Sequence, residues 1–369
     1  MEYLARELRE LADVRVRCFG ADRDEPGVSA YRVPGGLASA NAALQVLGVD
    51  LEMAAACAGA DVVHSHTWYA NFAGHVATML HGVPHVITTH SLEPLRPWKA
   101  EQLGGGYTIS SWAERTALAA ADAVIAVSEG MRRDVLAAYP EIPAERVSVI
   151  HNGIDTAEYA PDPGVDVLEK HGVDPRRPYV VFVGRITRQK GLVHLLHAAR
   201  SFDPEAQLVL CAGAPDTPEI AAEVTDLVRG LDRKGVFWIQ EMLPKPEVIQ
   251  LLTHATVFVC PSVYEPMGIV NLEAMACETA VVATATGGIP EVVADGETGL
   301  LVPISQGADG TPHDPELFAA DLAERVNALL GDPERARAMG EAGRARAVGH
   351  FSWSRIAHRT LGLYESLRA

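Results

Sequence analysis

The chain has 369 residues, of which 48% are hydrophobic and 21% charged, and its formal net charge at pH 7 is −17. This length is enough for two domains that each bury a core of their own. The acidic excess disfavours nucleic acid or an anionic membrane as a general partner. No apolar run reaches about 18 residues, the length that predicts a membrane-spanning helix.

The five cysteines, at positions 18, 57, 211, 260 and 277, lie in apolar contexts without CxxC spacing. We therefore expect reduced, buried thiols and a cytoplasmic protein. Charged side chains are interspersed among the apolar ones in residues 1–11, a pattern that does not resemble a secretion signal.

The first half opens with leucines at helical spacing in residues 1–11, followed by a predicted strand at 13–20. A long Ala- and Leu-rich stretch at 38–59 predicts a second helix. The next predicted strand, 61–63, runs into the polar sequence HSHTWY.

The two histidines of this sequence, His64 and His66, admit two interpretations. A metal site is one, but no nearby cysteine or carboxylate completes a ligand set. For His64 we favour a plain polar role, in which it caps the helix that follows.

The strand predicted at 85–91 also ends in polar groups, among them His90. A long loop is expected at 92–111, because it holds Pro94, Pro97 and three consecutive glycines. Long loops of this kind are often functional. Its Arg96, Lys99 and Tyr107 could bind a phosphorylated or polyhydroxyl acceptor, or could simply be solvated.

A domain boundary is predicted after the strand at 147–150. Asn152-Gly153 is a turn signal, and Pro161, Pro163 and Gly164 follow closely. We place the two domains at 1–157 and 158–351.

The second half begins with a strand at 179–183 and the loop Gly184-Arg185-Ile186-Thr187-Arg188-Gln189-Lys190-Gly191. Arg185 and Lys190 lie in a strand-to-helix loop, where two cations and helix N–H groups can converge on a diphosphate. Charged loop residues are more often merely solvated, so this pair alone is a weak signal.

Residues 257–291 are the most informative stretch of the chain. A buried strand at 257–260 is followed by a loop with Glu265 and Gly268, and a helix is expected from about Ile269. Glu273 lies in the second turn of this helix, and Gly268 lets the backbone approach a ligand. A further strand, 280–284, ends in a glycine pair. The pattern indicates the ligand-binding end of a parallel α/β sheet.

The spacing of these residues resembles a known family. Glu265, seven residues, Glu273 and then the sequence GGIPE are similar to the donor site of retaining glycosyltransferases of the glycogen synthase and sucrose synthase type. The loop at 184–191 matches the G-R-x-x-x-x-K-G motif of the same family. The resemblance implies the GT-B fold, in which two Rossmann-like, doubly wound α/β domains face a central cleft.

The resemblance also implies what each part of the chain does. Residues 1–157 would be the acceptor side, onto which the final helix at 352–369 crosses back, and 158–351 the nucleotide-sugar donor side. Relatives of this type begin with a strand and a Gly-rich loop that this sequence does not show. We expect that first strand to be missing, and favour a start assigned too far downstream over a real truncation.

The family's functional residues map onto this sequence in three groups. The catalytic group would be Glu265, His90, Arg185 and Lys190. The donor would be bound by Gly184, Arg185, Lys190, Met242, Glu265, Gly268, Ile269, Val270 and Glu273. The acceptor would be bound by Thr67, Arg96, Lys99 and Tyr107, although Thr67 replaces an acid found in many bacterial glycogen synthases.

The sequences of several segments, such as HSHTWYAN and CPSVYEPMGIVNLEAMAC, resemble those of actinobacterial glycogen synthase-like enzymes. The resemblance implies a retaining glucosyltransferase that uses ADP-glucose, or UDP-glucose, without a metal or other cofactor. Its acceptor would be glucose 1-phosphate, giving maltose 1-phosphate, or the end of a glycogen chain. The alternatives are another small or lipid acceptor, and a truncated, non-catalytic protein that binds a nucleotide sugar. A homodimer is one open alternative for its assembly.

Overall fold

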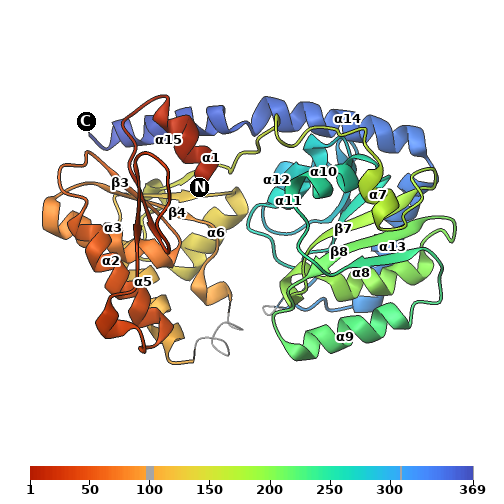
Figure 1. Ribbon diagram of the computed structural model, residues 1–369, viewed down its shortest axis with the longest axis horizontal. Helices are drawn as coiled ribbons and strands as arrows, with labels where there is room; N and C mark the ends of the chain where they lie inside the picture. The colour runs from red at the N-terminus through yellow and green to blue at the C-terminus, as the bar shows by residue number, and fades with distance from the viewer. Residues whose placement is uncertain (97–103, 308–309, 369) are drawn as a thin grey trace. The chain divides into compact units, whose positions relative to one another are not determined.

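The computed structural model describes residues 1–96, 104–307 and 310–368. The chain forms two α/β units (Figure 1). Unit 1 comprises Met1–Asn152 together with Trp353–Ala369, and unit 2 comprises Gly153–Ser352. At the two ends of unit 2, the Ile154 N–H donates a hydrogen bond to the Phe351 carbonyl at 2.7 Å, and Ile154 forms a parallel bridge with Ser352. The chain therefore enters and leaves unit 2 at adjacent points.

The strands of unit 1 all run parallel and form two sheets. One pairs β1 (Val16–Phe19) with β2 (Val28–Tyr31), and the other has the order β3 (Val63–His66), β4 (His85–Thr89), β5 (Ala123–Ala126), β6 (Val147–Val149). Every residue of the central strands β4 and β5 is buried. This pattern is typical of parallel sheets that are covered on both faces.

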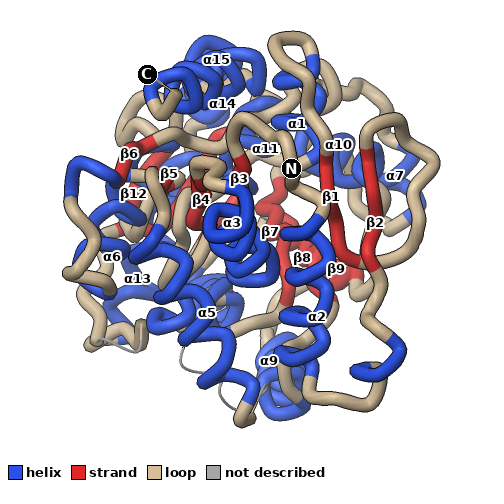
Figure 2. The backbone as a smooth tube through the Cα atoms, turned by 90° about the vertical axis from the view of Figure 1, so that its left-hand side faces the viewer, coloured by secondary structure: helices blue, strands red, loops and turns tan. Residues whose placement is uncertain are grey.

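Helices cover the strands of unit 1, and α2, α3 and α5 pack on one another (Figure 2). The helices are α1 (Glu2–Arg9), α2 (Ala42–Ala55), α3 (Trp68–His81), α5 (Gly106–Ala120), α6 (Glu129–Ala138) and α15 (Trp353–Ser366), with 3-10 turns at Gly35–Leu37, Glu93–Leu95 and Ala144–Arg146. Leu4 and Leu8 of α1 share a core cluster with Ile356 and Ala357 of α15. The last helix of the chain is thus part of the core of unit 1.

Two sequence-based predictions in this unit need correction. The loop expected at 92–111 ends early, because α5 begins at Gly106 and buries one face that includes Ser110 and Glu114. His64 does not cap the next helix. It lies inside β3, which begins at Val63, and its ring bonds Thr88 Oγ1 at 2.7 Å and the Tyr364 hydroxyl of α15.

Unit 2 contains one six-stranded parallel sheet. Its spatial order is β12 (Gly299–Val302), β11 (Ala280–Thr284), β10 (Val257–Cys260), β7 (Tyr179–Arg185), β8 (Gln207–Gly213), β9 (Val236–Ile239). From β7 the chain first extends the sheet through β8 and β9 and then returns to add β10 on the other side. The order therefore reverses between β7 and β10, the point at which doubly wound sheets bind ligands.

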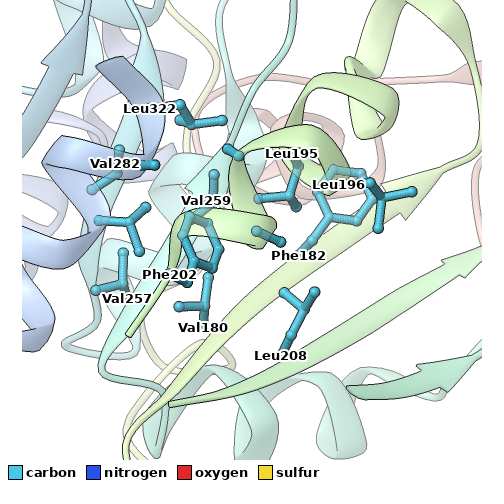
Figure 3. Close-up of a cluster of buried hydrophobic side chains, with 14 of the residues drawn as sticks. Val180, Phe182, Leu195, Leu196, Phe202, Leu208, Val257, Val259, Val282 and Leu322 are labelled. Carbon is cyan, nitrogen blue, oxygen red and sulfur yellow. The ribbon is translucent and has the colours of Figure 1, made fainter. Parts of the chain in front are cut away.

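Helices pack on both faces of this sheet. They are α7 (Asp166–Lys170), α8 (Leu192–Ala198), α9 (Pro218–Arg229), α10 (Lys245–Thr253), α11 (Ile269–Ala276), α12 (Ile289–Val292), α13 (Pro315–Leu330) and α14 (Pro333–His350), with 3-10 turns at Arg188–Lys190 and Ala199–Ser201. Figure 3 shows the main core, where Val180 of β7 and Val259 of β10 lie among side chains of α8 and α13, such as Leu195 and Leu322. None of the described helices is long and apolar enough to cross a membrane.

Candidate active site

The carboxyl ends of β7 and β10 bring two loops of unit 2 together. The strands are direct neighbours, with Val180 opposite Val257. The Val263 N–H donates to the Gln189 carbonyl at 2.9 Å, and the Gln189 side chain donates to the Tyr264 carbonyl at 3.0 Å. A Cβ atom added at Gly191, whose φ is +65°, would lie 2.0 Å from a backbone oxygen of the second loop. These hydrogen bonds and the close backbone approach at Gly191 hold the two loops in fixed positions relative to each other.

This arrangement places Lys190 against Glu265. The ammonium donates to Glu265 Oε2 at 2.7 Å, and only 24% and 11% of the two side chains are exposed. Burial alone would lower the pKa of Lys190, but the charge and the hydrogen bond of the Glu265 carboxylate act against it, and the pKa is raised. Lys190 is thus a fixed cation at the end of the sheet.

The backbone of Glu265 is also fixed. Its carbonyl accepts a hydrogen bond from the Gly288 N–H at 3.0 Å. At Gly287, with φ of +54°, an added Cβ would lie 1.9 Å from the same carbonyl oxygen. On the side-chain end, the Ser262 hydroxyl donates to Glu265 Oε2 at 3.3 Å. Both side-chain contacts use Oε2, so Oε1 has no hydrogen-bond partner among the described residues.

Helix α11 begins at the same edge of the sheet. Its N-cap is Gly268, with φ of +94° and no side chain to cap the first turn. The N–H groups at Ile269 and Val270 therefore suit an anion. One turn later Glu273 Oε1 accepts a hydrogen bond from the Tyr159 hydroxyl at 3.1 Å. Burial raises the pKa of Glu273 to about 7.

Three further residues assigned to the donor group lie on neighbouring parts of unit 2. Arg185 ends β7, is largely exposed, and pairs with Asp216 at 3.3 Å. Its neighbour Gly184 lies inside β7, opposite Ala212 of β8. Met242 lies between β9 and α10 and is 90% exposed.

In unit 1, His90 follows β4 and faces His66. The ring atoms His90 Nε2 and His66 Nδ1 are 3.0 Å apart, and the ring centroids 5.3 Å. Burial, and to a lesser degree the positive chain terminus, lowers the pKa of His90 to about 4. The pKa of His66 is lowered as well, chiefly by burial. Both rings are neutral at pH 7.

The residues assigned to the acceptor have different surroundings. Thr67 caps α3 with φ of +64° and ψ of 162°, a backbone conformation that costs a β-branched residue about 1–3 kcal/mol. Arg96 donates to Ser91 Oγ at 3.1 Å. The Tyr107 hydroxyl, in the first turn of α5, donates to the Glu93 carbonyl at 2.8 Å. Lys99 lies outside the described residues.

Sequence reasoning missed Ser262 and Tyr159, which hold the two glutamates of the donor group. Ser262 lies three residues before Glu265, so its proximity could have been inferred from the loop. Tyr159 is 114 residues from Glu273, and no local pattern indicates that contact. Among the described residues, no group of three or more His, Cys, Asp or Glu side chains is placed to hold a metal ion.

Two α/β units with parallel sheets, of which unit 2 is doubly wound and carries a fixed cation, a carboxylate and a helix N-terminus at one strand edge, define a glycosyltransferase of the GT-B class. Residues 166–346 match the family described as "Glycosyl transferases group 1", and residues 1–158 match "Glycosyltransferase Family 4". The chain belongs to the group 1 glycosyltransferases and is a hexosyltransferase.

Individual relatives agree with this assignment. The protein named "Alpha-maltose-1-phosphate synthase" of Mycolicibacterium smegmatis is 59% identical, over 99% of this chain and 94% of the relative. The protein of the same name from Mycobacterium tuberculosis is 57% identical, over 98% of this chain and 93% of the relative. Among solved structures, sucrose-phosphate synthase from Thermosynechococcus elongatus superposes with a TM-score of 0.79 at 27% identity, covering 99% of this chain and 91% of that one.

Proposed function

We propose that this protein transfers glucose from ADP-glucose to glucose 1-phosphate, with retention of configuration, and so forms maltose 1-phosphate. The observation that carries the proposal is the 59% identity, over 99% of the chain, to a relative named "Alpha-maltose-1-phosphate synthase". The geometry of unit 2 supports the donor assignment, because Lys190 and the N-terminus of α11 have the positive charge that stabilises a diphosphate leaving group.

Each donor residue then has a distinct task. Lys190, Arg185 and the N–H groups after Gly268 stabilise the negative charge that grows on the diphosphate as the glycosidic bond breaks. Glu265 Oε1 accepts hydrogen bonds from hydroxyls of the glucose. Glu273 accepts those of the ribose, and the loop that carries Met242 lies beside the base.

The acceptor half of the proposal assigns residues 1–157, with 352–369, to glucose 1-phosphate. His90, held neutral by burial, contacts the donor sugar and adds no positive charge beside the oxocarbenium-like carbon. Arg96 and Lys99 neutralise the acceptor phosphate. Thr67 and Tyr107 shape the sugar site.

The chemical step is a front-face substitution. The bond from glucose C1 to the diphosphate oxygen breaks, the bond from C1 to the acceptor 4-oxygen forms on the same face, and the departing phosphate takes the proton of the acceptor hydroxyl. Glu265 binds the sugar and does not attack it, in contrast to the nucleophilic carboxylate of retaining glycosidases. Trapping a covalent glycosyl-Glu265 adduct with a donor analogue would refute this step.

Product analysis tests the proposal directly. The purified protein is incubated with ADP-glucose plus glucose 1-phosphate, or plus glycogen, with UDP-glucose as the alternative donor. Maltose 1-phosphate from the first mixture supports the proposal. Label that enters glycogen alone would make the protein a chain-elongating synthase, the second candidate. Turnover of neither, by a folded protein that binds the nucleotide, would favour another acceptor or a non-catalytic role.

We also propose a cytoplasmic location. It is supported by the free state of all five cysteines, three of which are buried. Light scattering at two protein concentrations would decide between a monomer and a homodimer.

A further inference from the structure

The carboxylate of Glu273 is held by a residue outside the motifs that the family resemblance supplied. Tyr159 lies shortly after the point at which the chain enters unit 2, and its side chain is buried. Its hydroxyl donates to Glu273 Oε1 at 3.1 Å. Within the described part of the chain the Glu273 side chain makes no other hydrogen bond or ion pair, so Oε2 is the oxygen available to a ligand.

Tyr159 is itself fixed from two sides. Its N–H donates to the Asp155 carbonyl at 2.8 Å, which closes a turn. Arg344 of α14 donates from Nη1 to the Tyr159 carbonyl at 3.2 Å and also to the carbonyl of Ala276, the last residue of α11. One guanidinium therefore ties the Tyr159 backbone to the helix that carries Glu273. These contacts hold the Tyr159 hydroxyl in place against the Glu273 carboxylate.

Three charged side chains act on Glu273. Lys245 of α10 pairs at 3.1 Å with Glu158, the residue before Tyr159, and Lys190 ends the 3-10 turn that follows β7. Burial is the largest influence and raises the pKa of Glu273 to about 7, whereas the Tyr159 hydroxyl, Lys245 and Lys190 lower it and Glu158 raises it. The carboxyl group is thus near half-titration at neutral pH. Without the tyrosine hydroxyl the neutral form would predominate.

We infer that Tyr159 is a positioning residue for the donor nucleotide: its hydroxyl donates to Oε1 of Glu273 and so leaves Oε2 oriented toward the ribose hydroxyls. An ionised carboxylate accepts two hydroxyl hydrogen bonds, whereas a protonated one must donate at one oxygen. This inference rests on the proposed role of Glu273 in binding the nucleotide. It adds a dependence of nucleotide binding on one remote hydroxyl group and on pH.

The test is ADP binding by calorimetry from pH 6 to pH 8.5, on the full-length wild type and Tyr159→Phe. Loss of one hydrogen bond to the carboxylate raises the pKa of Glu273 by about one unit, which lowers its ionised fraction at pH 7 about fivefold. We expect ADP to bind about fivefold more weakly at pH 7 and within about twofold of wild type at pH 8.5. Tyr179→Phe is the matched control, because it also removes a buried hydroxyl bond in unit 2, to the Leu251 carbonyl.

Glu273→Gln supplies the second arm. This variant has no carboxyl group to titrate, so adding Tyr159→Phe to it should change ADP affinity less than about twofold at any pH. A Tyr159→Phe defect that is the same at every pH, that persists in the Glu273→Gln background, or that Tyr179→Phe reproduces would overturn the inference.

The outcomes also separate the inference from the proposed function. A wild type that makes maltose 1-phosphate while Tyr159→Phe binds ADP normally refutes only the inference. A wild type that binds ADP with the expected Tyr159 dependence but forms no maltose 1-phosphate refutes only the acceptor assignment. A wild type that binds neither ADP nor UDP overturns both.

Discussion

Replacing Asp50 by asparagine should stabilise unit 1 near neutral pH, by an amount that grows as the pH rises from about 5 to about 8. Asp50 lies in α2, is fully buried, and neither carboxyl oxygen has a hydrogen-bond partner within the described residues. Burial raises the pKa of its carboxyl group from 3.8 to about 8. Because the folded-state pKa is the higher one, the native state binds more protons than the unfolded state between these two values. Stability is therefore lost as the pH rises from about 4 to about 8, and no further loss follows above that.

The magnitude follows from the width of this window. Each pH unit inside this window lowers the unfolding free energy by about 1.36 kcal/mol. Between about pH 5 and pH 7.5 the wild type therefore loses about 3 kcal/mol of unfolding free energy, whereas Asp50→Asn, which does not titrate, loses none of it. The asparagine amide still lacks partners, which offsets the gain by about 1–3 kcal/mol at every pH. The gain should therefore be small or negative at pH 5 and clear at pH 7.5.

Pulsed hydrogen exchange at increasing urea would measure this effect in unit 1 alone. The protein is equilibrated at pH 5 or pH 7.5, and the peptide that covers residues 42–55 is then labelled in a brief pulse at one fixed pH. Asp24→Asn, the same change at an exposed position, is the control and should leave the pH dependence unchanged. If the stability difference between wild type and Asp50→Asn is the same at both pH values, Asp50 does not carry the buried proton and the reasoning fails.

Three further predictions concern the candidate site. Lys190→Met should lower kcat/KM for the donor by at least about 100-fold, because the leaving group loses its fixed cation and Glu265 its partner; wild-type turnover would exclude the proposed role. Gly287→Ala should impair folding or turnover, since its Cβ would lie 1.9 Å from the Glu265 carbonyl, whereas Gly296→Ala, at similarly positive φ but with nothing within 4 Å, should retain turnover. Thr67→Gly should raise the unfolding free energy of unit 1 by about 1 kcal/mol through relief of backbone strain, with lower activity; a destabilised Thr67→Gly would mean that the strain is absent.

The fold class could be predicted because its signals are local. Apolar strands, glycine turns and the spacing of Glu265, Glu273, Arg185 and Lys190 predicted a GT-B enzyme, and the parallel sheets and the solved relative confirm it. The loop at 92–111 was partly wrong for a physical reason. Its glycines suggested a break, but tertiary burial of the Ser110 and Glu114 face favours a helix that begins inside the glycine run.

The candidate site was predictable in its residues more than in its contacts. The motifs placed Lys190 and Glu265 in loops after two separate strands and, through the resemblance, in one donor site; the structure brings them within 2.7 Å. The motifs could not indicate that Arg185 pairs with Asp216, or that Tyr159 contacts Glu273, because these contacts depend on the packing of segments that are distant in the sequence. The roles assigned to these side chains stay predictions until the variants are measured.

The pairing of Ile154 with Phe351 and Ser352 has a consequence for engineering. Unit 2 is one continuous segment, residues 153–352, and its two ends lie side by side, so the whole segment can be exchanged as one piece. Its counterpart is assembled from two separate stretches and cannot be excised as one piece. With the donor assigned to unit 2 as proposed, we expect that exchanging this segment among relatives would change the donor and keep the acceptor.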